Sequence, residues 1–249
     1  MSRRRICLLF SLICLALAVL IFLFIYLPRN SRPADELEYR PKPPEIISQD
    51  DPVPDSTPDV SEEPEASPDM VDGLPVGKLI ATRERADYTL PTLTLKIPKL
   101  GVTYGVYNGT SSNELRYGVG LYDYAQMPGE GNRNTSIAGH RNSVVNGRIT
   151  DAAPFYYIDT LGEGDYIYLY DKEHIYRYVW KECYVVEADD WSPIYTTGYS
   201  CITLTSCHPI GISDHRIIVR GVLDGIFEND GNYRYPATVA EGAETDEEH

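Results

Sequence analysis

The chain has 249 residues, with 37 acidic and 22 basic side chains and a formal net charge of −15. This length allows one domain of good size together with appendages. The absence of a basic stripe argues against a nucleic-acid partner, because such a partner needs Lys and Arg to neutralise its phosphates. Most of the charge lies in two segments: residues 34–72 carry 13 acidic and 2 basic residues, and residues 228–249 carry 7 and 1.

The N-terminal segment has the pattern of a membrane anchor. Three arginines at positions 3–5 precede residues 6–27, a run of 22 residues without any charge. A run of this length spans the hydrocarbon core as a helix, and the arginines before it predict a cytoplasmic N-terminus and an extracellular remainder. The competing interpretation is a cleaved signal peptide, which has a shorter apolar region and a small-x-small cleavage site. We therefore expect cytoplasmic arginines and a single-pass transmembrane anchor in residues 1–27.

Two further segments are predicted to be disordered. Residues 28–75 hold 11 of the 18 prolines and contain no Phe or Trp, so they cannot bury enough apolar surface to offset the entropy of ordering. We expect an acidic stalk there and an acidic tail in residues 228–249.

The segment between them, residues 76–227, is rich in the residues that favour strands. Short runs between Gly, Pro, Asn and Asp predict strands at residues 92–97, 102–107, 135–140, 166–170, 175–186, 200–207 and 216–223. Ser111 and Glu114 have the spacing of a capping box and predict a short helix over residues 111–115, and residues 78–86 are a second short candidate. The fold class is therefore all-β with few helices, and the pattern alone does not separate a barrel from a sandwich.

The end of this segment has the parts of a cysteine acyl-transfer site. One predicted strand ends on Cys207, and the next begins on Arg216 nine residues later. A third strand-like run ends on His140. A thiol, an imidazole and a guanidinium at strand ends suit nucleophilic catalysis through a covalent intermediate.

Several motifs in residues 90–224 resemble the sortases, the membrane-anchored cysteine transpeptidases of Gram-positive surfaces. They are Gly105-Val106-Tyr107-Asn108-Gly109-Thr110, a Gly118-Val119-Gly120 turn, Ala138-Gly139-His140-Arg141, Thr203-Leu204-Thr205-Ser206-Cys207 and Arg216. The run from Cys207 to Arg216 most resembles the pilin-polymerising class C enzymes. The resemblance implies a closed eight-stranded β-barrel, no cofactor, and a sorting-signal substrate of the Leu-Pro-x-Thr-Gly (LPxTG) type on surface proteins or pilins.

The resemblance also implies roles for the three side chains. Cys207 is expected to form a thioester with the signal's threonine, and His140 to act as general acid and base. Arg216 is expected to stabilise the oxyanion. The accepting amine is expected to be a pilin lysine or a peptidoglycan precursor.

Two features depart from the family pattern. The family's threonine before the cysteine is Ser206 here, which keeps the hydroxyl. The class C lid carries an Asp-Pro-aromatic motif, and its nearest match, Asp51-Pro52-Val53, lacks the aromatic residue. A class D-like or housekeeping-like sortase function is therefore kept as an alternative to class C.

Other residues near the site have alternative interpretations. Ser206, His215 and Trp191 are candidate substrate contacts, and Arg220, which shares a strand face with Arg216, is the alternative guanidinium. Cys183 and Cys201 are structural candidates that could pair as a disulfide. We expect no metal, because the spacing of His208 and His215 around Cys207 fits no zinc pattern.

Two alternatives to a sortase remain. An L,D-transpeptidase-like crosslinker also uses Cys and His on a β-rich fold, but it would carry a Ser-His-Gly-Cys run that this sequence lacks. A membrane-tethered β-barrel binding module would have no use for the Cys207 thiol.

Overall fold

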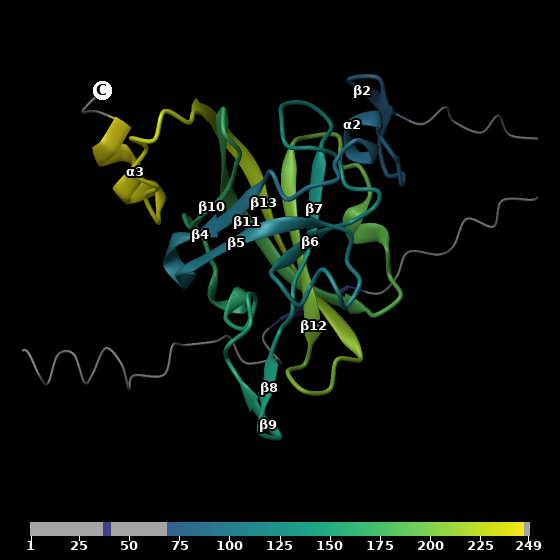
Figure 1. Cartoon of the computed structure of the whole chain (residues 1–249). Helices are drawn as coiled ribbons and strands as arrows, with labels where there is room; N and C mark the ends of the chain where they lie inside the picture. The colour runs from purple at the N-terminus through teal and green to yellow at the C-terminus, as the bar shows by residue number, and fades with distance from the viewer. Residues whose placement is uncertain (1–36, 41–68, 247–249) are drawn as a thin grey trace, which may run out of the picture. The chain divides into compact units, whose positions relative to one another are not determined.

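The computed structural model describes residues 37–40 and 69–246 (Figure 1). The predicted transmembrane residues 6–27 and residues 41–68 of the predicted stalk lie outside the described residues. Within the described ranges, no helix combines the length and apolar character needed to cross a bilayer.

Eight strands of the described chain close into a barrel, as predicted. In order around it they are β10 (Tyr166–Tyr170), β4 (Thr94–Ile97), β5 (Val102–Asn108), β6 (Val119–Leu121), β7 (Asn134–Ala138), β12 (Cys201–His208), β13 (His215–Glu228) and β11 (His174–Glu187). Antiparallel pairing between β11 and β13, together with pairing between β10 and β11, closes the circle. Two neighbouring pairs are parallel, β5 with β6 and β7 with β12.

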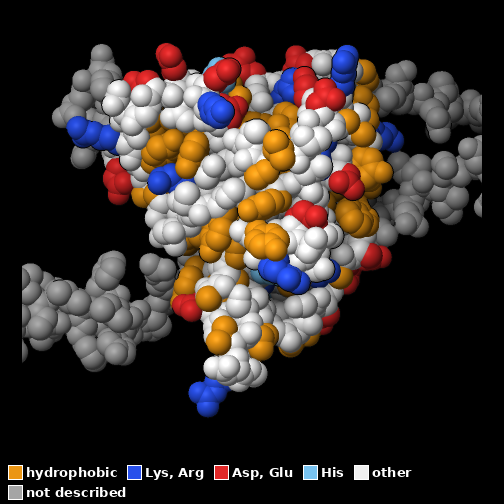
Figure 2. All heavy atoms as spheres, viewed as in Figure 1, with side chains coloured by type: hydrophobic (Ala, Val, Ile, Leu, Met, Phe, Trp, Pro, Cys, Tyr) orange, Lys and Arg blue, Asp and Glu red, His pale blue; other side chains and the backbone are white. Residues whose placement is uncertain are grey.

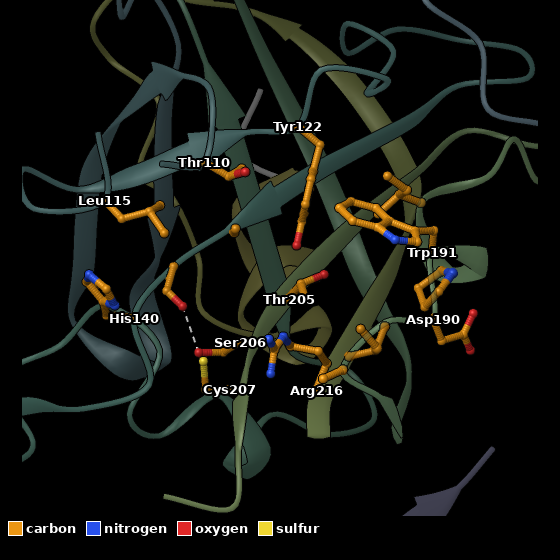
Figure 3. A pocket seen from close by; sticks show the side chains of 16 residues that line it. Thr110, Leu115, Tyr122, His140, Asp190, Trp191, Thr205, Ser206, Cys207 and Arg216 are labelled. Carbon is orange, nitrogen blue, oxygen red and sulfur yellow. Dashed lines mark hydrogen bonds between the residues drawn. The ribbon is translucent and has the colours of Figure 1, made fainter. Parts of the chain in front are cut away.

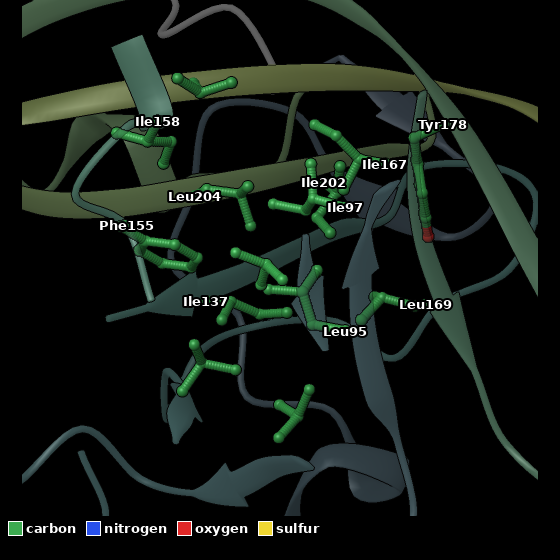
Figure 4. Packing of buried hydrophobic residues seen from close by; sticks show 14 of the residues in the cluster. Leu95, Ile97, Ile137, Phe155, Ile158, Ile167, Leu169, Tyr178, Ile202 and Leu204 are labelled. Atoms are coloured by element: carbon green, nitrogen blue, oxygen red, sulfur yellow. The ribbon is translucent and has the colours of Figure 1, made fainter. Parts of the chain in front are cut away.

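The barrel interior holds the main hydrophobic core, because successive strand residues point to opposite faces of a sheet. Ile202 and Leu204 on β12 and Ile167 and Leu169 on β10 are fully buried there. Figure 4 shows them packed against inward-facing residues of the neighbouring strands, among them Leu95, Ile97 and Ile137. The alternate β12 residues, Thr203, Thr205 and Cys207, therefore lie on the outer face.

Some local predictions were wrong. The Gly118-Val119-Gly120 segment was expected to be a turn, but Val119–Leu121 forms strand β6. A Cβ at Gly120 would lie 2.0 Å from the carbonyl oxygen of Gly109, so this strand needs glycine to approach its neighbour. Residues 111–115 form turns rather than a helix, although the Ser111 and Glu114 side chains do hydrogen-bond.

The remaining short elements lie around the barrel. They are α2 (Arg83–Ala86), capped by Thr82 within the predicted helix 78–86, the 3₁₀ turns η2 (Pro98–Leu100), η3 (Ile158–Thr160) and η4 (Ser192–Ile194), and the hairpin of β8 (Ser143–Val145) and β9 (Arg148–Thr150). The hairpin was not predicted. Its Val144, Val145 and Ile149 side chains are exposed. The hairpin lies at the lower end of the molecule in Figure 1, where Figure 2 shows apolar side chains on the surface.

The prediction of disorder was wrong for parts of the stalk and most of the tail. Within residues 28–75, β1 (Glu38–Tyr39) pairs in parallel with β11, and β2 (Met70–Val71) pairs with β3 (Leu74–Pro75). Within residues 228–249, the chain includes helix α3 (Val239–Asp246). The Tyr168 hydroxyl donates to the Pro236 carbonyl at 2.7 Å, and the ring of Tyr235 packs edge-on against that of Tyr168. The tail thus covers the outer tyrosine face of β10.

Candidate active site

Cys207 and Arg216 face each other across two antiparallel strands. The residue partnered with Cys207 of β12 is Arg216 of β13. Directly opposite residues of an antiparallel pair project from the same face of the sheet. Both side chains are partly exposed and line the same cleft.

His140 reaches the same rim from the other side of β12. In the parallel β7–β12 pair, Ala138 is opposite Thr205, and the Gly139 amide continues the pairing by donating to the Thr205 carbonyl at 3.1 Å. Two residues beyond Ala138, His140 comes level with Cys207. Figure 3 shows Cys207 between His140 and Arg216, and the structure therefore brings the three predicted catalytic residues together.

The guanidinium of Arg216 is held from behind. Its Nη1 donates to the carbonyls of Ser213 and His215, at 3.1 and 2.8 Å. No described residue accepts a hydrogen bond from its Nη2 or Nε, which are therefore free to donate to a bound group. A planar guanidinium can hold two backbone oxygens and still present donors elsewhere.

The cleft beside these residues has a volume of about 300 Å³. The rings of Tyr122 and Trp191 meet edge to face in its wall, with centroids 6.1 Å apart and planes at 84°. Trp191, a predicted substrate contact, is 51% exposed. Ile194 and Leu115 add further apolar surface.

Sequence reasoning missed two polar residues of this cleft. The Thr205 hydroxyl oxygen is buried, and in Figure 3 the hydroxyl of Tyr122 points towards Thr205. Burial raises the pKa of Tyr122 and so keeps the phenol neutral. Strand alternation from Cys207 could have identified Thr205, whereas Tyr122 lies in a loop without a periodic signal.

The other two predicted substrate contacts have different surroundings. Ser206 lines the cleft, but its buried hydroxyl donates to the Gly139 carbonyl at 2.7 Å and so joins β12 to the end of β7. His215 is not among the residues that line the cleft. Its Nδ1 lies 2.8 Å from the Asp214 carboxylate, which raises the pKa of His215.

Arg220, the alternative guanidinium, is buried and fully engaged. It donates to the Pro193 carbonyl at 2.7 Å and to the Thr203 hydroxyl at 3.2 Å, and it pairs with Glu182 at 3.2 Å. These contacts anchor η4, the turn next to Trp191, and leave Arg216 as the guanidinium of the cleft. Cys183 and Cys201, the candidate disulfide pair, are not joined in a disulfide.

A closed eight-stranded barrel with Cys, His and Arg on one outer rim is the arrangement that the sequence motifs implied. The sequence profile of the sortase domain matches residues 95–224, and the chain belongs to the sortase family.

Similar proteins include several sortase types. Sortase A of Bacillus anthracis is 30% identical over 131 residues, which are 53% of this chain and 59% of that protein. The structure of sortase E1 from Streptomyces coelicolor, with a tripeptide in its active site, has a TM-score of 0.52 and 28% identity over 59% of this chain and 95% of that one. Sortase C1 from Streptococcus agalactiae has a TM-score of 0.51 and 25% identity over 60% and 80%. The chain thus spans less than two thirds of the curated sortase A that it matches.

Proposed function

We propose that this protein is a surface cysteine transpeptidase that cleaves an LPxTG-like sorting signal after threonine and joins the new end to an amine. The observation that carries this proposal is that His140, two residues past the end of β7, Cys207 of β12 and Arg216 of β13 line one cleft.

In the proposed reaction, the Cys207 thiolate attacks the threonine carbonyl carbon, and the carbonyl electrons move to its oxygen. N–H groups of Arg216 donate to this oxyanion. When the tetrahedral intermediate collapses, the peptide C–N bond breaks and the His140 imidazolium gives its proton to the leaving amine. An incoming amine then loses a proton to His140 and attacks the thioester, and Cys207 leaves as the thiolate. Because the first step needs a thiolate and an imidazolium together, we expect a bell-shaped dependence of rate on pH.

The cleft lining supports a signal that begins with apolar residues. Trp191, Tyr122 and Ile194 form an apolar wall suited to a Leu-Pro pair, next to the polar end at Cys207. We propose that this pair occupies the aromatic end and that the scissile threonine lies between His140 and Arg216.

The cellular setting is also part of the proposal. The arginines and apolar run of residues 1–27 support a single-pass membrane anchor with a cytoplasmic N-terminus and an extracellular catalytic domain. The partners would be surface proteins or pilins with C-terminal sorting signals. The accepting amine is a pilin lysine, as the class C likeness suggests, or a peptidoglycan precursor.

The test uses the full chain in detergent with a panel of LPxTG-like peptides and two amines, a lysine-bearing peptide and a peptidoglycan-precursor analogue. We expect mass spectrometry to find a thioester on Cys207 and a ligated product, both absent in Cys207→Ala. The amine that gives the faster ligation distinguishes pilus assembly from wall anchoring. Failure to form an adduct with any peptide would refute the transpeptidase and favour the non-catalytic binding module.

A further inference from the structure

We propose that the buried ion pair between Arg141 and Asp159 is a positioning device that holds His140 for proton transfer. The inference deepens the proposed function and rests on it. The two residues do not line the cleft, so they would act through the His140 backbone.

His140 needs such a device because its own ring is not anchored. The side chain is exposed, and no described residue forms a hydrogen bond with the imidazole. The residue also follows the last residue of β7, Ala138, by two positions and so lies beyond the regular strand. The placement of the ring therefore depends on how firmly the backbone at residues 139–141 is held.

One side of this backbone is joined to the strand that carries the nucleophile. The Gly139 amide donates to the Thr205 carbonyl at 3.1 Å, and the Ser206 hydroxyl donates to the Gly139 carbonyl at 2.7 Å. These bonds fix Gly139 relative to Cys207, but they end one residue before His140.

The other side is held by residues 155–159. The Phe155 amide donates to the His140 carbonyl at 3.1 Å, and Nη1 of Arg141 donates to the Phe155 carbonyl at 3.1 Å. Nη2 of Arg141 lies 2.9 Å from a carboxylate oxygen of Asp159 in η3. The guanidinium thus ties the residue after His140 both to Phe155 and to η3.

The packing leaves little room for movement. The Arg141 and Asp159 side chains are only 2% and 5% exposed. The Phe155 ring lies against Gly139 so closely that a Cβ there would be 2.6 Å from two ring carbons. The backbone of residues 139–141 is therefore held between β12 and the 155–159 segment, while the His140 ring stays exposed.

A buried ion pair is a poor source of stability, since desolvation offsets much of its attraction and apolar replacements often fold as well. Burial lowers the pKa of the Arg141 guanidinium, which is the signature of that desolvation. What the pair does supply is placement, because the Asp159 carboxylate holds the guanidinium where its Nη1 donates to the Phe155 carbonyl. A positioning role accounts for a costly pair next to the general acid and base.

The main test compares wild type with the double variant Arg141→Met/Asp159→Leu and with Asp159→Asn, all in the full chain. We expect the double variant to keep its circular dichroism spectrum and to lose about 10- to 100-fold in kcat, the scale of a displaced catalytic group, with KM within about twofold. The matched control is Asp224→Asn, which breaks the 2.6 Å ion pair between Arg177 of β11 and Asp224 of β13, eight residues beyond Arg216. The control should lower stability and leave kcat unchanged.

A second readout needs no peptide substrate. The rate at which iodoacetamide alkylates Cys207 is measured from pH 5 to 9, because an imidazolium beside the thiolate shapes this profile. We expect the profile of the double variant to move towards that of His140→Ala. If wild type ligates no peptide but the profile moves, the proposed function fails and the positioning inference stands.

A folded double variant with wild-type kcat and an unchanged alkylation profile would overturn the inference. If no variant of Arg141 or Asp159 folds, the test is made on the wild-type protein. The quantity measured is then the hydrogen-exchange rate of the Phe155 amide, which donates to the His140 carbonyl. We expect protection similar to that of the β12 amides. Exchange as fast as in an exposed loop would show that the 155–159 segment holds nothing in place, and would also overturn the inference.

Discussion

Replacing Ser206 by alanine separates two roles for its hydroxyl, substrate contact and strand coupling. The hydroxyl is buried and donates to the Gly139 carbonyl at 2.7 Å. Its loss leaves a buried carbonyl without this donor, which costs about 1–3 kcal/mol. For a domain of this size, each kcal/mol lowers Tm by about 2–4 °C. Because the bond joins β12, which carries Cys207, to Gly139, the residue before His140, we expect a lower Tm together with a lower kcat.

The assay is thermal melting followed by circular dichroism, with peptide ligation measured well below Tm. Ser206→Thr is the matched variant, since it keeps the hydroxyl and should retain more of both properties than alanine. If Ser206→Ala keeps its Tm and instead raises KM, the hydroxyl binds substrate as the sequence suggested, and the strand-coupling argument is wrong.

Three further outcomes are expected. Arg216→Ala should lower kcat by about 10²–10³-fold in the ligation assay, as loss of an oxyanion donor does. Arg216→Lys should not restore it, because an ammonium lacks the planar fork that donates through Nη1 to two carbonyls and through its other nitrogens to the oxyanion; a nearly active lysine variant would contradict this role. Burial lowers the pKa of His208 below its ordinary 6.5, so the unfolded chain takes up the proton first and stability should fall as pH drops below about 6.5. Urea melts at pH 5 and 7 measure the loss of unfolding free energy on acidification, and this loss should be smaller in His208→Asn than in wild type. An equal loss in the two proteins would show that another group causes the effect. Glu182→Gln weakens the support of Arg220, which anchors Pro193, and should raise the peptide KM several-fold; an unchanged KM would show that η4 holds its position without this pair.

The barrel strands were largely predictable because strand-favouring residues and the turn residues that flank them are visible in the local sequence. Short runs of strand-favouring residues between turn residues located β10 where Tyr166–Tyr170 lies, and β12 and β13 within one residue of their starts. The rim position of Cys207 and Arg216 followed from strand ends alone. Their direct opposition did not, because register depends on pairing between segments distant from the local pattern.

The errors come from contacts that the local sequence does not display. Residues 228–246 are polar and acidic, which favours disorder, yet Tyr233 and Tyr235 pack on the outer face of β10. A clue was present in β10 itself, where tyrosines alternate with Ile167 and Leu169 and both faces are large and apolar. A strand of this kind needs a second covering layer, and the tail supplies it.

The position of the site follows from the two kinds of pairing that meet at β12. Antiparallel pairing with β13 places the first residues of that strand beside the last residues of β12, so Arg216 faces Cys207. Parallel pairing with β7 makes both strands end on the same rim, so the residue just past β7, His140, also arrives there. Neither pairing alone would collect all three groups. The parallel pair, however, leaves His140 outside the ladder of backbone bonds, and the chain must hold it by other contacts. The buried pair of Arg141 and Asp159 lies where such a contact is needed.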